Sequence, residues 1–242
     1  MLRYLFPAAV LAACLLPAAA RADEGCWKLL DAAIEHRAAA VVPAYVSYSV
    51  RRSIFHGYGE PLVTDQRVVY RSSDGMADVV DSLYGDAERY TAQLEPGPPF
   101  VGPPNALRAG WIGDGSEGAI AVVHAHAGKA CDDLGATTIA GATVEHLRIT
   151  PYRAGASGIR DVWTDGSDEI RRAVVAQYLD GASIAGLGGA FLADCTIEVA
   201  SVGGQAVVAL VRFDLHSYHI SGEYLFGDYR FSATPPGGTF AR

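Results

Sequence analysis

Two histidines two positions apart are the side chains in this sequence that are best suited to hold a metal ion. In a strand, His124 and His126 project from one face about 7 Å apart, and Cys131, Asp132 and Asp133 follow closely. Imidazole and thiolate groups are ligands that zinc and copper favour. On a face turned toward solvent, the same histidines are ordinary surface residues. We therefore assign no metal and keep His124 and His126 as candidates, with solvated or hydrogen-bonded histidine as the favoured role.

Signals for other catalytic chemistry are absent from the sequence. No G-x-S-x-G elbow occurs, and the glycines of Gly186 to Gly189 do not form the dinucleotide fingerprint. No C-x-x-C pair occurs either, which argues against a thiol oxidoreductase. The sequence thus predicts no catalytic residues, no cofactor and no enzymatic activity.

The first 22 residues read as an export signal. Arg3 supplies a positive start, Leu5 to Leu16 an apolar stretch, and Ala20 to Ala22 a small-residue cleavage site. We therefore expect a signal peptide over 1–22 and a periplasmic or secreted mature protein. An overlapping lipoprotein box ends at Cys14, so a membrane-anchored lipoprotein modified at Cys14 is the alternative.

Cleavage removes two of the 19 basic residues and leaves 17 against 27 acidic ones, a net charge of −10. Nucleic acid and anionic membrane surfaces are poor partners for such a chain. About 220 residues suit a single all-β domain, predicted over 23–242 and expected to be a monomer. Cys26, Cys131 and Cys195 remain after cleavage, so one internal disulfide can form by any of three pairings.

The second half of the chain reads as an antiparallel meander. Asp165-Gly166 and Gly203-Gly204 are hairpin turn signals, because these residues accept the positive φ of tight turns. The alternating runs predict strands over Ala142 to Thr150, Ile159 to Thr164, Glu169 to Tyr178, Phe191 to Val202 and Gln205 to His216.

The first half begins with an amphipathic helix and then also becomes strand-like. Apolar residues at three- and four-residue steps predict a helix from Cys26 to Val42, which Pro43 ends. Further strands are predicted over Tyr45 to Ile54, Gln66 to Ser72, Met76 to Asp81 and Ala119 to Ala127. The segment Ser82 to Gly118 contains five prolines and several large apolar residues. We interpret it as a long connection that lies across the sheet as a cover.

This order of elements, with two local segments, resembles the LolA/LolB lipoprotein-carrier superfamily, which includes RseB-like sensors. The segments are His146 to Pro151 followed by Asp161 to Gly166, and the closing Tyr229-Arg230-Phe231. The resemblance implies a mainly β fold with α structure. Its sheet would be a strongly curved antiparallel half-barrel, with helices and a long loop covering the concave face and an apolar pocket for acyl chains.

An acyl carrier requires an apolar cavity rather than catalytic groups. Alternating apolar positions supply the candidate lining, which consists of Val46, Tyr48, Val122, Leu147, Ile149, Trp163, Ile197, Phe213 and Leu215. The same alternation also builds a closed core.

The sequence therefore favours an exported, non-enzymatic protein that binds a lipid, an acyl chain or a lipidated protein, as a carrier or an envelope sensor. Two alternatives stay open. One is a module of the same fold that acts through its surface on another envelope protein, and the other is a metal-dependent secreted hydrolase using His124 and His126.

Overall fold

The computed structural model describes residues 24–39, 41, 43–83, 86–93, 129–151, 158–180, 190–215 and 218–240. Within these residues the only helix is α1 (Glu24–Ala38). The strands are β1 (Tyr45–Phe55), β2 (Leu62–Arg71), β3 (Met76–Leu83), β4 (Asp86–Gln93), β5 (Lys129–Ile139), β6 (Ala142–Pro151), β7 (Gly158–Asp165), β8 (Ile170–Asp180), β9 (Ala190–Val202), β10 (Gln205–Leu215) and β11 (Ile220–Ser232). In the described part of the chain, no helix is both long and apolar enough to cross a membrane.

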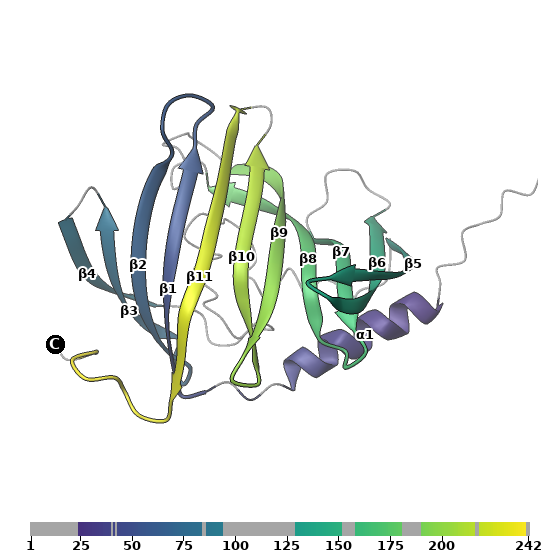
Figure 1. Ribbon diagram of the computed structural model, residues 1–242, viewed down its shortest axis with the longest axis horizontal. Coiled ribbons are helices and arrows are strands. Elements are labelled where there is room, and N and C mark those ends of the chain that lie inside the picture. Colours follow the sequence, from purple (N-terminus) through teal and green to yellow (C-terminus); the bar gives the residue numbers. More distant parts are fainter. Residues whose placement is uncertain are drawn as a thin grey trace, which may run out of the picture.

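The described strands form a single sheet in the order β4-β3-β2-β1-β11-β10-β9-β8-β7-β6-β5. All neighbouring strands are antiparallel, and the first strand lies beside the last. Among the described strands, β5 follows β4 in chain order. The two strands nevertheless form opposite edges of the sheet, as Figure 1 shows. The sheet is therefore an open, curved half-barrel, and the predicted fold class is confirmed for the sheet.

The five strands predicted in the second half are confirmed as β6 to β10, with ends that differ by one or two residues. The predicted strand Ala119 to Ala127 and most of the proposed covering segment lie outside the described residues. The predicted cover therefore stays a prediction.

Several predictions for the residues before β6 need correction, the first being β2, which begins at Leu62 rather than Gln66. Strand β4 falls inside the segment interpreted as a continuous loop, and β5 was not predicted. Both are edge strands, where charged residues such as Glu88 and Asp132 are tolerated although they obscure the alternation. Helix α1 ends at Ala38 rather than Val42, and Val41, which was expected to continue its apolar stripe, is 81% exposed.

One face of the sheet, called the core face below, carries the buried apolar side chains, and the opposite face is called the outer face. On β1, Val46, Tyr48 and Val50 are at most 4% exposed and alternate with more exposed neighbours. Ile197, Phe213 and Tyr224 bring β9, β10 and β11 into the same cluster. Helix α1 adds Trp27, Leu30 and Ile34 to it, so the helix and the sheet share one core.

A disulfide fastens α1 to an edge of the sheet. Cys26 in α1 is bonded to Cys131 in β5, with the two Cα atoms 5.8 Å apart. This is one of the three pairings that the sequence left open. Cys195 is the remaining free cysteine in the described residues, and it is buried. The bond holds the helix against β5, beside which α1 lies in Figure 1.

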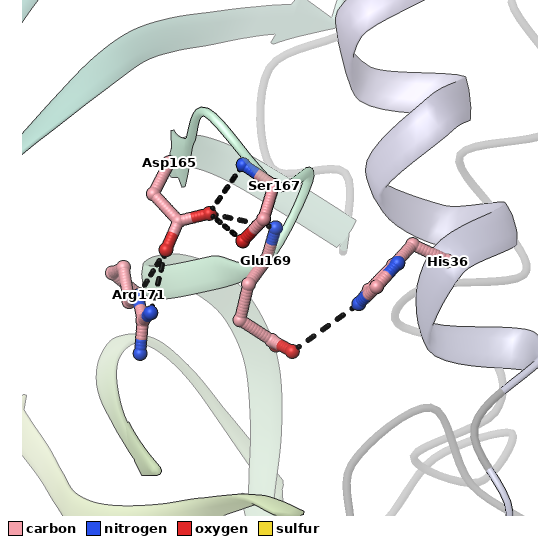
Figure 2. Close-up of polar contacts among 5 residues, drawn as sticks. All are labelled: His36, Asp165, Ser167, Glu169 and Arg171. Atoms are coloured by element: carbon pink, nitrogen blue, oxygen red, sulfur yellow. Dashed lines mark hydrogen bonds and ion pairs between the residues drawn. The ribbon is translucent and has the colours of Figure 1, made fainter. Parts of the chain in front are cut away.

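The turn between β7 and β8 forms a second attachment for α1, shown in Figure 2. Asp165 Oδ1 accepts hydrogen bonds from the backbone N–H and the hydroxyl of Ser167, at 2.9 and 2.6 Å. Its other oxygen accepts from Arg171 Nε at 2.6 Å. In the same turn, Glu169 Oε2 lies 3.6 Å from His36 Nε2 of the helix. The Asp165 network therefore orders the turn that presents Glu169 to α1.

Replacing Cys26 and Cys131 together by alanine is expected to lower the free energy of unfolding by about 2–5 kcal/mol. The reason is that the bond joins positions 105 residues apart and so restricts the unfolded chain strongly. Urea unfolding with and without a reductant measures the effect. Reductant should lower the midpoint of the wild-type protein and of a Cys195→Ala control, but not that of the double variant. Equal urea midpoints for the wild-type protein with and without reductant would contradict the disulfide between Cys26 and Cys131.

The pH dependence of stability is expected to change in Asp165→Asn. Burial alone would raise the pKa of Asp165, but hydrogen bonds from Ser167, Arg171 and Glu169 outweigh burial and lower the pKa from 3.8 to about 2. The carboxylate therefore stabilises the fold above about pH 4, and this contribution is lost as the pH falls from 4 to 2. Urea midpoints at several pH values should show a variant that is less stable at pH 7 and less sensitive to acid in that window.

Asp168→Asn is the matched control for this measurement, since Asp168 occupies the same turn at a positive φ of 59°, which asparagine also accepts. Its pH profile should follow that of the wild-type protein. Identical acid sensitivity in Asp165→Asn and wild type would rule out the proposed contribution.

Candidate ligand-binding site

Most of the predicted lining residues lie together on the core face. Each of them is 5% exposed or less, and all belong to one buried cluster. They are Val46, Tyr48, Leu147, Ile149, Ile197, Phe213 and Leu215. The structure thus joins side chains from β1, β6, β9 and β10 into one apolar surface.

Two predicted lining residues do not join this surface in the structure. Val122 lies outside the described residues. Trp163 lies on the outer face, where its ring stacks on His146 with centroids 4.2 Å apart and Arg172 Cζ lies 5.7 Å from the ring centroid. A β-bulge between Ile159 and Asp161 reverses the alternation, so that Val162 rather than Trp163 is buried in the core. We therefore remove Trp163 from the candidate lining.

Aromatic residues of β11 contribute to the core face, although the sequence did not single them out as lining. The ring of Tyr48 lies 6.5 Å from that of Phe226 and 5.6 Å from that of Tyr229. The register between β1 and β11 shifts between Ser47 and Ser49, which brings both rings to the same face. Tyr229 donates its hydroxyl hydrogen to the carbonyl oxygen of Val208 at 2.6 Å. Burial raises the pKa of Tyr229, so this donor stays protonated.

Helix α1 is too short to cover the whole core face. A helix of 15 residues is about 22 Å long, whereas 11 strands placed side by side extend over about 50 Å. The helix packs against β5 and β7, at one end of the sheet. The aromatic surface around Tyr48 belongs to β1 and β11, several strands away. The residues around Tyr48 are nevertheless buried in the ligand-free structure, so protein atoms other than those of α1 cover that surface.

The thiol of Cys195 on the core face is poorly suited to act as a nucleophile. Burial, together with the negative charge of Asp194, raises the pKa of the Cys195 thiol, which disfavours the nucleophilic thiolate. No group of three histidine, cysteine or acidic residues within the described ranges could hold a metal ion. His124 and His126 lie outside those ranges, so the metal site considered from the sequence is untested.

The outer face carries a groove of about 470 Å³ with a different character. Its walls combine hydroxyl and charged side chains, such as Thr196, Asp194 and Glu223, with the rings of Phe55 and Phe213. Arg212 Nε donates to Glu223 Oε2 at 2.6 Å inside this lining. Because charged side chains lie among the groove's rings, the continuous apolar surface of the core face is the better candidate for an apolar ligand.

Comparison with known proteins adds likenesses of fold. No protein-family model matches the chain, and no curated protein matches it by sequence. A DUF1329 family protein from Desulfovibrio piger is similar in structure, with 10% identity, a TM-score of 0.46, and coverage of 89% of this chain and 97% of that one. A candidate outer membrane lipoprotein-sorting protein domain from Vibrio parahaemolyticus has 12% identity, a TM-score of 0.46, and coverage of 88% and 95%.

A LolA superfamily protein from Nitrosomonas europaea is also similar, with 11% identity, a TM-score of 0.38, and coverage of 90% of this chain and 97% of that one. Because these identities and TM-scores are low, the argument for function rests on the side chains of this chain.

Gly222 is expected to be essential for the position of Phe213 on the core face. A Cβ atom at Gly222 would lie 2.2 Å from Cε1 of the Phe213 ring, so alanine must displace the ring. We expect Gly222→Ala to cost about 1–3 kcal/mol and to alter the near-ultraviolet circular dichroism. Gly227→Ala is the control on the same strand, because its nearest neighbour would be Ser49 Oγ at 3.7 Å.

A double-mutant cycle makes this prediction specific. Phe213→Leu removes the aromatic edge that would clash, so Gly222→Ala should cost less in that background than in the wild-type protein. Equal costs in the two backgrounds would show that the clash with Phe213 is not the cause.

Proposed function

We propose that this protein is an exported, non-enzymatic binding protein that holds a lipid, an acyl chain or a lipidated protein against its core face. The observation that carries this proposal is the mismatch in size between α1 and the apolar surface of the sheet. The helix covers the end at β5 and β7, while apolar and aromatic side chains continue through β11 and β1.

The energetics of burial fit an acyl ligand. Each buried methylene contributes roughly 0.8 kcal/mol, so a chain of about 16 carbons gains on the order of 12 kcal/mol before the costs of association. Those costs are several kcal/mol. The remainder corresponds to about micromolar affinity or better, which suits a carrier that must also release its ligand.

The disulfide supports the proposed destination. Cys26 and Cys131 form a bond that persists in oxidising compartments such as the bacterial periplasm. Export through the predicted signal peptide would place the protein there. Lipids and acylated envelope proteins are available in that compartment, and both would present the same chemistry, a hydrocarbon chain, to the core face.

Phe213→Ala tests the proposal on one core-face ring. We expect the affinity for a fluorescent fatty acid to fall about tenfold or more, with a loss of unfolding free energy below the 3–5 kcal/mol typical of a closed core. Tyr58→Ala is the control, because it removes an aromatic ring that is 84% exposed and lies outside the lining of the groove that Phe213 shares. A full core penalty with unchanged fatty-acid affinity would identify Phe213 as ordinary core packing.

Native mass spectrometry of the protein purified from a bacterial envelope fraction tests the ligand class directly. An added mass that extracts into organic solvent as an acyl species is the expected result. A bare polypeptide mass, together with no measurable fatty-acid binding, would contradict the proposal.

A further inference from the structure

A row of polar side chains crosses the otherwise apolar core face. Arg52 on β1 is paired with Thr64 on β2, and Gln66 on β2 is paired with Asp81 on β3. Thr64 and Gln66 are each only 7% exposed. They alternate with exposed residues of β2 and share their face with Val68, which belongs to the core cluster. We call Arg52, Thr64, Gln66 and Asp81 the polar row.

The polar row has hydrogen-bonding capacity that the described residues do not use. Gln66 Nε2 donates to Asp81 Oδ2 at 2.6 Å, and the Arg52 guanidinium lies 5.3 Å from the centroid of the Tyr224 ring. Arg52 Nε, Thr64 Oγ1 and Asp81 Oδ1 are buried, and none of these atoms has a hydrogen-bond partner in the structure as described. Buried polar atoms without partners are rare in native proteins. Three of them on adjacent strands and one face point to a polar group that binds there.

The unused atoms define the chemistry of that group. Arg52 and Thr64 offer hydrogen donors side by side, which suits a negatively charged oxygen atom. Asp81 offers an acceptor and a negative charge, which suits an ammonium group. Because the polar row contains one cation and one anion, a free carboxylate would satisfy Arg52 while Asp81 repelled it. A zwitterionic head group, which carries one negative and one positive charge, pairs with both Arg52 and Asp81.

The spacing agrees with a compact head of this kind. Thr64 and Asp81 are diagonal neighbours across the β2 and β3 pair, which places their Cβ atoms about 7–8 Å apart. A phosphate and a primary ammonium joined by two carbons bridge such a separation. Apolar side chains of the core cluster, such as Val50 and Val68, lie on either side of the polar row.

We propose that the polar row binds the phosphoethanolamine head of a lipid whose acyl chain lies on the core face. Phosphate oxygens accept from Arg52 and Thr64, and the ammonium donates to Asp81. The inference rests on the proposed function and deepens it, because it names the ligand as a zwitterionic amphiphile and assigns the residues that select its head.

Displacement of a fluorescent fatty acid from the full mature chain tests this assignment with three probes of equal chain length. Lysophosphatidylethanolamine carries the complete head, lysophosphatidylcholine lacks the ammonium N–H donors, and hexadecanol lacks both charges. Arg52→Gln and Thr64→Val should each weaken lysophosphatidylethanolamine binding about tenfold or more and leave hexadecanol binding unchanged. Asp81→Asn should abolish the preference for the ethanolamine over the choline head.

The outer face provides matched controls for the charge changes. Arg51 and Asp65 lie on β1 and β2 with side chains 63% and 64% exposed, and their charged groups are 3.9 Å apart. Arg51→Gln and Asp65→Asn make the same chemical changes on neighbouring strand positions of the opposite face. Both variants should bind all three probes as the wild-type protein does.

The stability of the ligand-free protein separates a binding role from a structural one. Thr64→Val replaces a buried unpartnered hydroxyl by a methyl group of similar shape, so the melting temperature should stay equal or rise. A lower melting temperature with unchanged head preference would make the polar row structural and overturn the inference. If hexadecanol and the two lysophospholipids bind equally well, the inference about the head group is overturned and the proposed function stands. If none of the three probes binds, the inference and the proposed function are both overturned.

Discussion

A sheet that turns one long apolar face inward must keep that face from water, and the other features of the structure follow from this constraint. Helix α1 shields the end at β5 and β7. It is held there by the bond from Cys26 to Cys131 and by the contact between His36 and Glu169. The cover at this end is therefore fixed covalently, while the surface around Tyr48 depends on something other than α1. An apolar binding protein needs this division between a fixed cover and a face that a ligand shares.

The two faces of the sheet differ in how their polar groups are satisfied. On the outer face, charged side chains pair across strands, as Arg212 does with Glu223 at 2.6 Å. Such partly exposed pairs contribute on the order of 1 kcal/mol or less, and they mark the face that meets water. On the core face, Thr64 and its neighbours in the polar row are buried with unused hydrogen-bonding atoms. The proposed amphiphile would place its chain on the apolar surface and its head on the polar row.

Much of the fold follows from local sequence signals. Alternation and turn residues such as Gly203-Gly204 predicted β6 to β10 within two residues, because side-chain period and positive φ are local properties. The edge strands β4 and β5 escaped prediction, since strands paired on one side tolerate charges that break the alternation. Seven of the nine predicted lining residues proved to lie in one cluster, because an apolar face is encoded position by position.

The sequence by itself thus determined the antiparallel class, most strands and an apolar face that needs a cover. Only the tertiary structure decided which cysteines pair, since Cys26 and Cys131 are brought together by the packing of α1 on β5. It also decided the face of Trp163, because a β-bulge reverses the alternation there. The polar row arises from registers among three strands, and register depends on which strands become neighbours. A linear pattern carries no information about that choice.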